Sequence, residues 1–281
     1  MPWTITRIDH VAVVRMDSNK LNIIDHSFLD EWEKTLDTLD RDYADCSVVF
    51  IGNDKSFSAG LDLGILTSMI DPKNVQTVES YIERVDRLGW RLFTFSRPTV
   101  AAINSHAIAG GTLIASACDY RIACGASASK AKCGLNEVQN GFYIPYRMQK
   151  ICSFAFNQRG AYKHFVDGHL LTLEQAASSE YGWVDKIVPP PANASANLYS
   201  KENFLSTPLV KAAIERVSMN PKSYKAYAYT KKIQQEELRA LVESKPNATR
   251  ETLQLLQQQI KEELKAAKAS KEPRVSGKSA L

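Results

Sequence analysis

The sequence predicts an α/β fold, in which a core of buried, largely parallel strands is followed by a helical C-terminal segment. Runs rich in Val and Ile alternate with segments in which apolar residues recur every three or four positions, as in repeated strand–helix–strand units. After the triple proline at residues 189–191, and beyond about residue 200, only the helical spacing continues.

The strands of the core are expected in the apolar runs. These are residues 10–16, 46–52, 98–104, 119–124 and 183–189. Two long helices are expected between them. The first carries an apolar face of Leu29, Trp32, Leu36 and Leu39, with Ser27 and Asp30 placed as a capping box at its start. The second carries Val78, Ile82, Val85, Leu88, Leu92 and Phe95, and ends before Pro98.

The last predicted helix is amphipathic. Its apolar face consists of Leu253, Leu256, Ile260 and Leu264, and the other positions are mostly Gln, Lys and Glu. A helix of this kind must cover the core or a neighbouring subunit. We therefore divide the chain into a core with the active site (1–198), a C-terminal helical oligomerisation segment (199–270) and a flexible tail (271–281), and expect a homo-oligomer.

Composition bounds the class of protein. The 281 residues are 44% hydrophobic and 23% charged, with a net charge of +4, enough for one large domain and without the basic patch of a nucleic-acid-binding face. No apolar run reaches about 18 residues, so no membrane span is expected. The five cysteines show no CxxC spacing, which favours free thiols and gives no metal-ligand cluster.

The two ends of the sequence suggest a compartment. The first residues lack a signal-peptide core and an Arg-rich presequence. The last three, Ser279, Ala280 and Leu281, form a near variant of the Ser-Lys-Leu peroxisomal address. We expect a peroxisome-type organelle (peroxisome or glycosome), with the import receptor as a partner, and the mitochondrial matrix as the alternative.

Two turns of small residues are the main functional signal. Residues 58–60 follow an apolar strand, and residues 109–111 precede an apolar helix. Glycine lets a ligand approach the backbone closely, and the N–H groups at a helix start can stabilise an oxyanion. Close packing of a helix on a strand also requires small residues, and the two interpretations are compatible.

The residues around these turns resemble the crotonase (enoyl-CoA hydratase/isomerase) superfamily. The matching segments are residues 57–63, 102–111 and 117–122, and the resemblance extends from about His10 to the C-terminal helices. It implies a spiral of ββα units whose C-terminal helices form a trimer, with a hexamer as the alternative. It also implies that the N–H groups of Leu61 and Gly110 form the oxyanion hole for a thioester carbonyl.

Within the superfamily, residues 134–141 are most similar to the catalytic segment of mitochondrial-type Δ3,Δ2-enoyl-CoA isomerases, with Glu137 as the base. Hydratases carry a second glutamate at the position of Leu113. Hydration needs one group to activate water and another to protonate carbon, whereas one carboxylate can move a proton from C2 to C4. The sequence therefore predicts an isomerase. We expect apolar neighbours at 142–145 to raise the pKa of Glu137.

The resemblance also implies a binding site for the acyl-CoA substrate, with CoA as its carrier and no separate cofactor or metal. The residues carried over for it are Lys20, Leu21, Ser58, Ala59, Gly60, Asp62, Leu63 and Asn136. Three alternatives remain: a hydratase or another crotonase activity such as thioester hydrolysis, a non-catalytic acyl-CoA-binding member, and RNA binding, for which a basic aromatic patch is lacking.

Overall fold

The computed structural model describes residues 3–125, 127–190, 198–218 and 221–269. A six-stranded sheet forms the centre, in the order β1-β2-β4-β6-β8-β11. Its strands are β1 (Thr4–Ile8), β2 (Val11–Arg15), β4 (Ser47–Ile51), β6 (Thr99–Ile103), β8 (Tyr120–Cys124) and β11 (Lys186–Val188). β1 and β2 form an antiparallel hairpin, and the other neighbours pair in parallel, as predicted.

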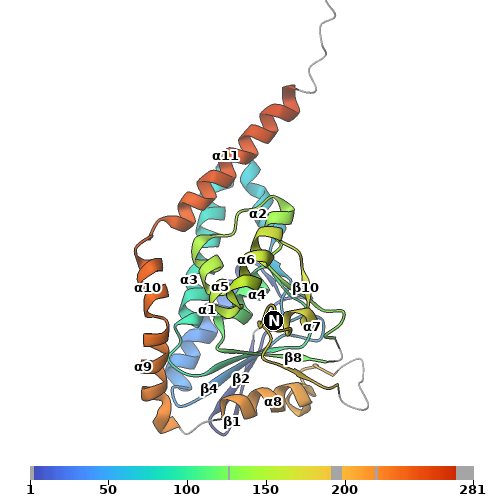
Figure 1. The fold of residues 1–281 in the computed structure, drawn as a ribbon, viewed down its shortest axis with the longest axis vertical. Coiled ribbons are helices and arrows are strands. Elements are labelled where there is room, and N and C mark those ends of the chain that lie inside the picture. Colours follow the sequence, from blue (N-terminus) through green and yellow to red (C-terminus); the bar gives the residue numbers. More distant parts are fainter. Residues whose placement is uncertain (1–2, 126, 191–197, 219–220, 270–281) are drawn as a thin grey trace, which may run out of the picture.

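Strand residues alternate between two apolar layers because successive side chains point to opposite faces of a sheet. In β2, Ala12 and Val14 belong to one core cluster, and Val11 and Val13 belong to the other. The first cluster lies between the sheet and the helices α1 (His26–Asp42), α3 (Val75–Phe93) and α4 (Gly110–Ala117). The second lies between the sheet and α8 (Pro208–Val217). Figure 1 shows α8 below the sheet and the other three helices above it.

Three details of the expected elements were wrong. α3 ends at Phe93, so Phe95 lies beyond the helix, although it is buried in the same core. Asp25, not Ser27, caps α1, since its side chain accepts from the N–H of Phe28 at 2.8 Å. Asp30 cannot close a capping box because, with Asp25 as the N-cap, it is the fifth residue of the helix and not the third. Its carboxylate forms an ion pair with Arg84 of α3 at 2.7 Å. The last strand begins at Lys186, later than predicted, because the backbone N–H groups of Trp183 and Val184 donate to Ala176 O at 2.8 and 3.1 Å. The buried indole of Trp183 donates to Ser116 of α4 at 2.9 Å.

Two small sheets join the segments that carry the glycine turns. β3 (Ile23–Ile24) pairs with β5 (Gly60–Leu61), and β9 (Lys132–Gly134) pairs with both β7 (Ala107–Ile108) and β10 (Leu171–Thr172). Short helical elements follow, which are α2 (Leu63–Thr67), η1 (Ser68–Ile70), η2 (Pro72–Asn74), η3 (Val138–Asn140), α5 (Tyr146–Ala155), α6 (Gln158–Asp167) and α7 (Leu173–Ala176). These pairings bring segments that are far apart in the sequence close together in space.

After residue 198 the described chain is helical between its turns, as predicted. Its elements are η4 (Phe204–Ser206), α8, η5 (Pro221–Ser223), α9 (Tyr224–Gln234), α10 (Glu236–Glu243) and α11 (Ala248–Ala269). α11 buries Leu253 and Leu256 against the core, so its apolar face covers its own chain. Figure 1 shows its far end projecting from the body. The predicted oligomerisation role and domain boundaries stay predictions.

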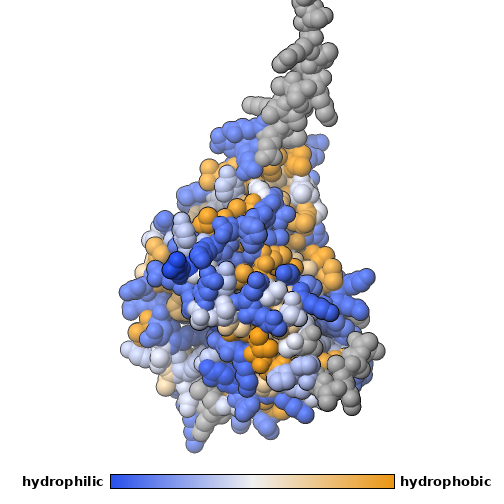
Figure 2. Space-filling view, turned by 45° about the vertical axis from the view of Figure 1, so that its right-hand side comes forward, coloured by the Kyte–Doolittle hydropathy of each residue, from blue (hydrophilic) through white to orange (hydrophobic). Residues whose placement is uncertain are grey.

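Part of the sequence-based interpretation lies outside the described residues. This applies to the side chain of Leu264, to the tail 271–281 and to its terminal Ser279, Ala280 and Leu281. Among the helices that are described, none combines the length and apolar character needed to cross a membrane. Figure 2 shows a mostly hydrophilic face with apolar residues in small groups.

Candidate active site

The two glycine turns lie against each other. Gly60 has a φ of +93°, and a Cβ added to it would lie 2.6 Å from the carbonyl oxygen of Ile108 and 2.9 Å from Cβ of Ala109. A Cβ on Gly110 would lie 3.1 Å from Cδ2 of Leu61. Only glycine fits this close approach at position 60. The structure thus brings together Leu61 and Gly110, the two residues predicted to supply oxyanion donors.

The residue between the strand and helix of the second turn is strained. Ala109 is the N-cap of α4 and has φ 50° and ψ −114°, a conformation that costs a residue with a side chain on the order of 1–3 kcal/mol. Such strain is held where it positions neighbouring groups. Here the strained residue places the start of α4 at Gly110. The N–H of Gly110 belongs to the first turn of this helix, where N–H groups have no acceptor within the helix and where the positive end of the helix dipole lies.

A buried asparagine fastens the first turn to the loop at residues 19–22. Asn22 has a φ of 49° and is fully buried, and its side-chain amide donates to the carbonyl oxygen of Met16 at 2.9 Å. Its own carbonyl oxygen accepts from the Ser58 hydroxyl at 2.7 Å, and Ala59 N–H donates to Leu21 O at 3.0 Å. Exposed Lys20 and Leu21 therefore lie next to the turn.

Glu137 is a buried carboxylate. Its side chain comes from the residue before η3, and its backbone oxygen accepts from the N–H groups of Asn140 and Phe142, both at 2.9 Å. Glu137 is 8% exposed, and neither carboxylate oxygen has a hydrogen-bond partner among the described residues. Burial raises the pKa of Glu137 to about 7, so this group can both take and release a proton near neutral pH.

The segment that leads to Glu137, residues 134–137, is hydrogen-bonded to the second turn and to a histidine. Ala109 N–H donates to Gly134 O at 2.8 Å, and Gly134 N–H donates to the Thr112 hydroxyl at 2.8 Å. Leu135 N–H donates to Nε2 of buried His164 at 3.0 Å. Sequence reasoning missed His164, because a single histidine in an amphipathic helix gives no signal of a partner 29 residues away.

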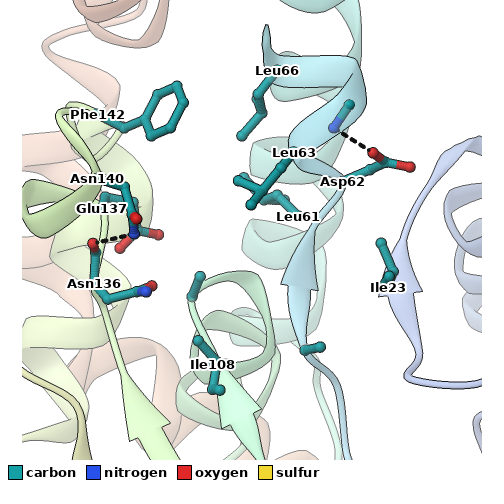
Figure 3. A pocket seen from close by; sticks show the side chains of 13 residues that line it. Ile23, Leu61, Asp62, Leu63, Leu66, Ile108, Asn136, Glu137, Asn140 and Phe142 are labelled. Atoms are coloured by element: carbon teal, nitrogen blue, oxygen red, sulfur yellow. Dashed lines mark hydrogen bonds between the residues drawn. The ribbon is translucent and has the colours of Figure 1, made fainter.

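These groups surround a cavity of about 440 Å³ (Figure 3). Its lining consists of Ile23, Ala59, Leu61, Asp62, Leu63, Gly64, Leu66, Ile108, Ala109, Asn136, Glu137, Asn140 and Phe142. In Figure 3, Glu137 and Asn136 lie across the pocket from Leu61 and Asp62. Of the other predicted site residues, Ser58, Gly60 and Gly110 are buried behind the lining, and Lys20 and Leu21 lie outside it.

Two polar residues of the lining have structural partners. Asp62 caps α2, because its Oδ1 accepts from the N–H groups of Gly64 at 2.7 Å and Ile65 at 3.2 Å. The backbone oxygen of Asn136 accepts from the side-chain amide of Asn140 at 2.9 Å. Asp62 and Glu137 are the ionisable side chains of the lining, and only the carboxylate of Glu137 lacks a hydrogen-bond partner there among the described residues.

Leu113 is part of the core. It is fully buried in α4, and the tip of its side chain packs on Gly89 of α3, where an added Cβ would lie 3.1 Å from Leu113 Cδ2. The apolar surroundings of the base also differ from those expected at 142–145. Tyr143 is 44% exposed, and Phe142 is the residue of that segment that lines the cavity.

Residues 6–267 match the family model described as enoyl-CoA hydratase/isomerase, and the chain belongs to this family. A putative enoyl-CoA hydratase from Thermus thermophilus is 32% identical over 184 residues, covering 64% of this chain and 69% of that protein. Human mitochondrial enoyl-CoA delta isomerase 1 is 30% identical over 199 residues, covering 70% of this chain and 63% of the human protein.

Solved structures share the fold over most of the chain. A Mycobacterium tuberculosis protein, described as an enoyl-CoA isomerase in one solved structure and as a probable enoyl-CoA hydratase in another, superposes in the first with a TM-score of 0.70 at 26% identity, covering 91% of this chain and 97% of that one. Human mitochondrial Δ3-Δ2-enoyl-CoA isomerase gives a TM-score of 0.72 at 24% identity, covering 96% and 100%. The chain therefore has the crotonase fold, and its relatives include both hydratases and isomerases.

Proposed function

We propose that this protein is a Δ3,Δ2-enoyl-CoA isomerase that converts 3-enoyl-CoA to trans-2-enoyl-CoA during the oxidation of unsaturated fatty acids. One observation carries the proposal: Glu137 is the one carboxylate in the lining that has no hydrogen-bond partner among the described residues. A single carboxylate suffices to move a proton within one substrate molecule, and it matches isomerisation better than a reaction that needs two acids.

The proposed reaction has two proton transfers at Glu137. The ionised carboxylate removes a proton from C2, and the electrons move into the thioester carbonyl to give a dienolate. The N–H groups of Leu61 and Gly110 stabilise the negative oxygen, an effect typically worth several kcal/mol. Glu137 then returns the proton to C4, so that the double bond lies between C2 and C3. A pKa of about 7 suits a group that acts as base and then as acid.

The CoA part of the substrate is proposed to lie along the loop at Lys20 and Leu21 and the adjoining turn from Ser58 to Leu63. The bond from Ala59 N–H to Leu21 O holds these two segments together. Exposed Lys20 can approach a phosphate from solvent. Asn136 is proposed to contact the acyl portion, because it borders the cavity next to the base.

Hydration of 2-enoyl-CoA is the second candidate, since the relative from Thermus thermophilus is described as an enoyl-CoA hydratase. The residue Leu113 argues against hydration as the function. The position that holds a second acid in hydratases is occupied here by a buried leucine packed on α3. Of the two carboxylates in the lining, Asp62 caps α2, so a water molecule in the cavity would have Glu137 to activate it and no second unengaged acid to protonate carbon.

Assembly and location are further parts of the proposal. We propose a homotrimer that uses the C-terminal helices, tested by light scattering of the purified protein. We also propose import into a peroxisome-type organelle through Ser279, Ala280 and Leu281. Fusion of the last dozen residues to a fluorescent reporter tests this, with deletion of the three residues as the control.

The function is tested with trans-3-enoyl-CoA as substrate and Glu137→Gln as the variant. Glutamine keeps the size of the side chain and cannot accept the proton. We expect the isomerase rate to fall by a factor of about 10²–10⁴ with little change in KM. An unchanged melting temperature or a higher one establishes that the variant is folded. Isomerisation at the wild-type rate in this variant would refute the mechanism.

A further inference from the structure

We propose that the hydroxyl group of Tyr81 positions the two backbone N–H groups that form the proposed oxyanion hole, those of Leu61 and Gly110. This inference rests on the proposed function, because it concerns the same two donors. Tyr81 is not among the residues that line the cavity, so it acts through the backbone and not by contact with the substrate. It is therefore a positioning residue, on which the strength of the oxyanion hole depends.

Tyr81 is a buried residue of α3. It is 1% exposed and lies in the same apolar cluster as Val78 and Ile82, which are buried residues of the same helix. Burial removes the hydroxyl group of Tyr81 from solvent. A buried hydroxyl group requires hydrogen-bond partners within the protein, because an unpaired one costs free energy. The partners of this hydroxyl group are therefore a fixed part of the fold.

The hydroxyl group of Tyr81 forms two hydrogen bonds to the backbone next to the first turn. It donates to the carbonyl oxygen of Ile24 in β3, and it accepts from the N–H of Asp62 at 3.2 Å. Ile24 is the partner of Leu61 in the parallel pairing of β3 with β5, and Asp62 directly follows β5. The hydroxyl group therefore joins the two strands at the end of this small sheet. Burial raises the pKa of Tyr81, so the group keeps the proton that it donates.

The bond from Asp62 acts on the first oxyanion donor. The N–H of Leu61 belongs to the peptide before Leu61, and the N–H of Asp62 belongs to the peptide after it. Two successive planar peptides are joined by only two rotatable bonds, so fixing one of them limits the directions of the other. The side chain of Asp62 holds the same place from the other side, because it caps α2. The direction of the Leu61 N–H therefore depends on the hydroxyl group of Tyr81.

The bond to Ile24 acts on the second oxyanion donor. Ile24 is fully buried, and its Cδ1 would lie 2.7 Å from a Cβ added to Gly110, so its side chain packs directly on the start of α4. The side chain of Leu61 packs on the same glycine. A shift of β3 would therefore move the contact that supports Gly110. By holding the carbonyl oxygen of Ile24, the hydroxyl group of Tyr81 keeps this contact in place.

Tyr81→Phe removes the hydroxyl group and keeps the ring that packs in the core. The N–H of Asp62 and the carbonyl oxygen of Ile24 then lose this partner, and both oxyanion donors can shift. Stabilisation of an oxyanion depends steeply on the position of its donors, whereas most of the binding surface for the substrate is unchanged. We therefore expect kcat for trans-3-enoyl-CoA to fall about 10- to 100-fold, with KM nearly unchanged.

Infrared difference spectroscopy of bound hexanoyl-CoA, labelled with ¹³C at the thioester carbonyl, tests the role without any reaction. Donors that point at the carbonyl oxygen weaken the C=O bond and lower its stretching frequency, which a residue that only stabilises the fold would not affect. Tyr224→Phe is the matched control. Tyr224 is also buried, its hydroxyl group lies 3.0 Å from the Ser47 hydroxyl, and it does not line the cavity.

We expect the wild type and Tyr224→Phe to lower the frequency of the bound carbonyl equally, and Tyr81→Phe to lower it less. If Tyr81→Phe does not fold, Tyr81→4-aminophenylalanine replaces it. Its amino group donates more weakly than a hydroxyl group, so the frequency should lie between those of wild-type-bound and free hexanoyl-CoA.

The wild-type frequency in a folded variant at position 81 overturns the positioning role, even if the enzyme isomerises 3-enoyl-CoA. An unshifted frequency in the wild type overturns the oxyanion hole and this inference together. A frequency that is lowered in the wild type and depends on Tyr81, without isomerisation, overturns the proposed reaction and leaves the positioning role standing.

Discussion

The backbone N–H of Ala109 lies 2.8 Å from the carbonyl oxygen of Gly134 and donates a hydrogen bond to it. This bond joins the turn before Gly110 to the strand that leads to Glu137. The bond therefore helps to fix the distance between the proposed oxyanion donors and the proposed base, together with the bonds from Gly134 N–H to Thr112 and from Leu135 N–H to His164. Positions that support this frame should affect turnover more than substrate binding.

Gly60→Ala should disrupt the first turn. The added Cβ would lie 2.6 Å from the backbone oxygen of Ile108, and the φ of +93° is unfavourable for alanine. We expect a lower melting temperature and a loss of isomerase turnover on the order of 10²-fold. Gly64→Ala is the control, because its Cβ meets only the Asp62 side chain at 3.0 Å. Equal effects of the two substitutions would contradict a specific role for the close approach at Gly60.

His164 should act as a positioning residue for the base loop. Burial lowers the pKa of His164 to about 4, so near neutral pH its unprotonated Nε2 accepts from Leu135 N–H. His164→Phe would leave that N–H buried without an acceptor, at a cost of about 1–3 kcal/mol. We expect kcat to fall with KM nearly unchanged, and partial recovery in His164→Gln, whose oxygen can accept the bond. A purely structural role would lower stability in His164→Phe without changing the kcat of the folded enzyme.

Isomerase activity should depend on the ionisation of Glu137. The free enzyme needs the carboxylate form to remove the C2 proton, and burial raises the pKa of Glu137 to about 7. The value of kcat/KM should therefore be low at pH 5, rise through about pH 7 and level off above it. A profile that is flat between pH 5 and 8 would contradict Glu137 as the base.

The same shift predicts a pH-dependent stability. The pKa of Glu137 is raised from 4.5 to about 7, so between these values the folded state holds a proton that the unfolded state has released. Stability should thus fall as pH rises through this window, by on the order of 3 kcal/mol. Glu137→Gln removes the charge, and we expect it to melt about 5 °C or more above the wild type at pH 8.5 but close to it at pH 4.5. A variant less stable at both pH values would contradict this.

The sequence was sufficient for the main elements because burial leaves a regular pattern. A strand that is buried on both faces appears in the sequence as a valine-rich run, and a long helix appears as apolar residues recurring on one face. Both patterns can be recognised without a structure. Local competition decided the details that were wrong. Asp25 takes the N-cap position before Ser27 can, which leaves Asp30 beyond the third helical residue, and the backbone of Trp183 bonds to Ala176 instead of to the sheet.

Some features of the candidate site could likewise be predicted from the sequence, and others could not. Gly60, Gly110 and Glu137 could be recognised because their residue types and spacing carry the resemblance. The positive φ of Ala109, the contact of His164 with Leu135 and the two bonds of the Tyr81 hydroxyl group arise from segments far apart in the sequence. No local pattern encodes such contacts, so they could be found only from the structure.

The most direct test of the one-base account is an NMR time course of trans-3-dodecenoyl-CoA with the wild-type protein. One active carboxylate should move the double bond without adding water. We predict that the resonances of trans-2-dodecenoyl-CoA appear and that those of 3-hydroxydodecanoyl-CoA do not follow on the same time scale. Accumulation of the 3-hydroxy product at a comparable rate would contradict the account.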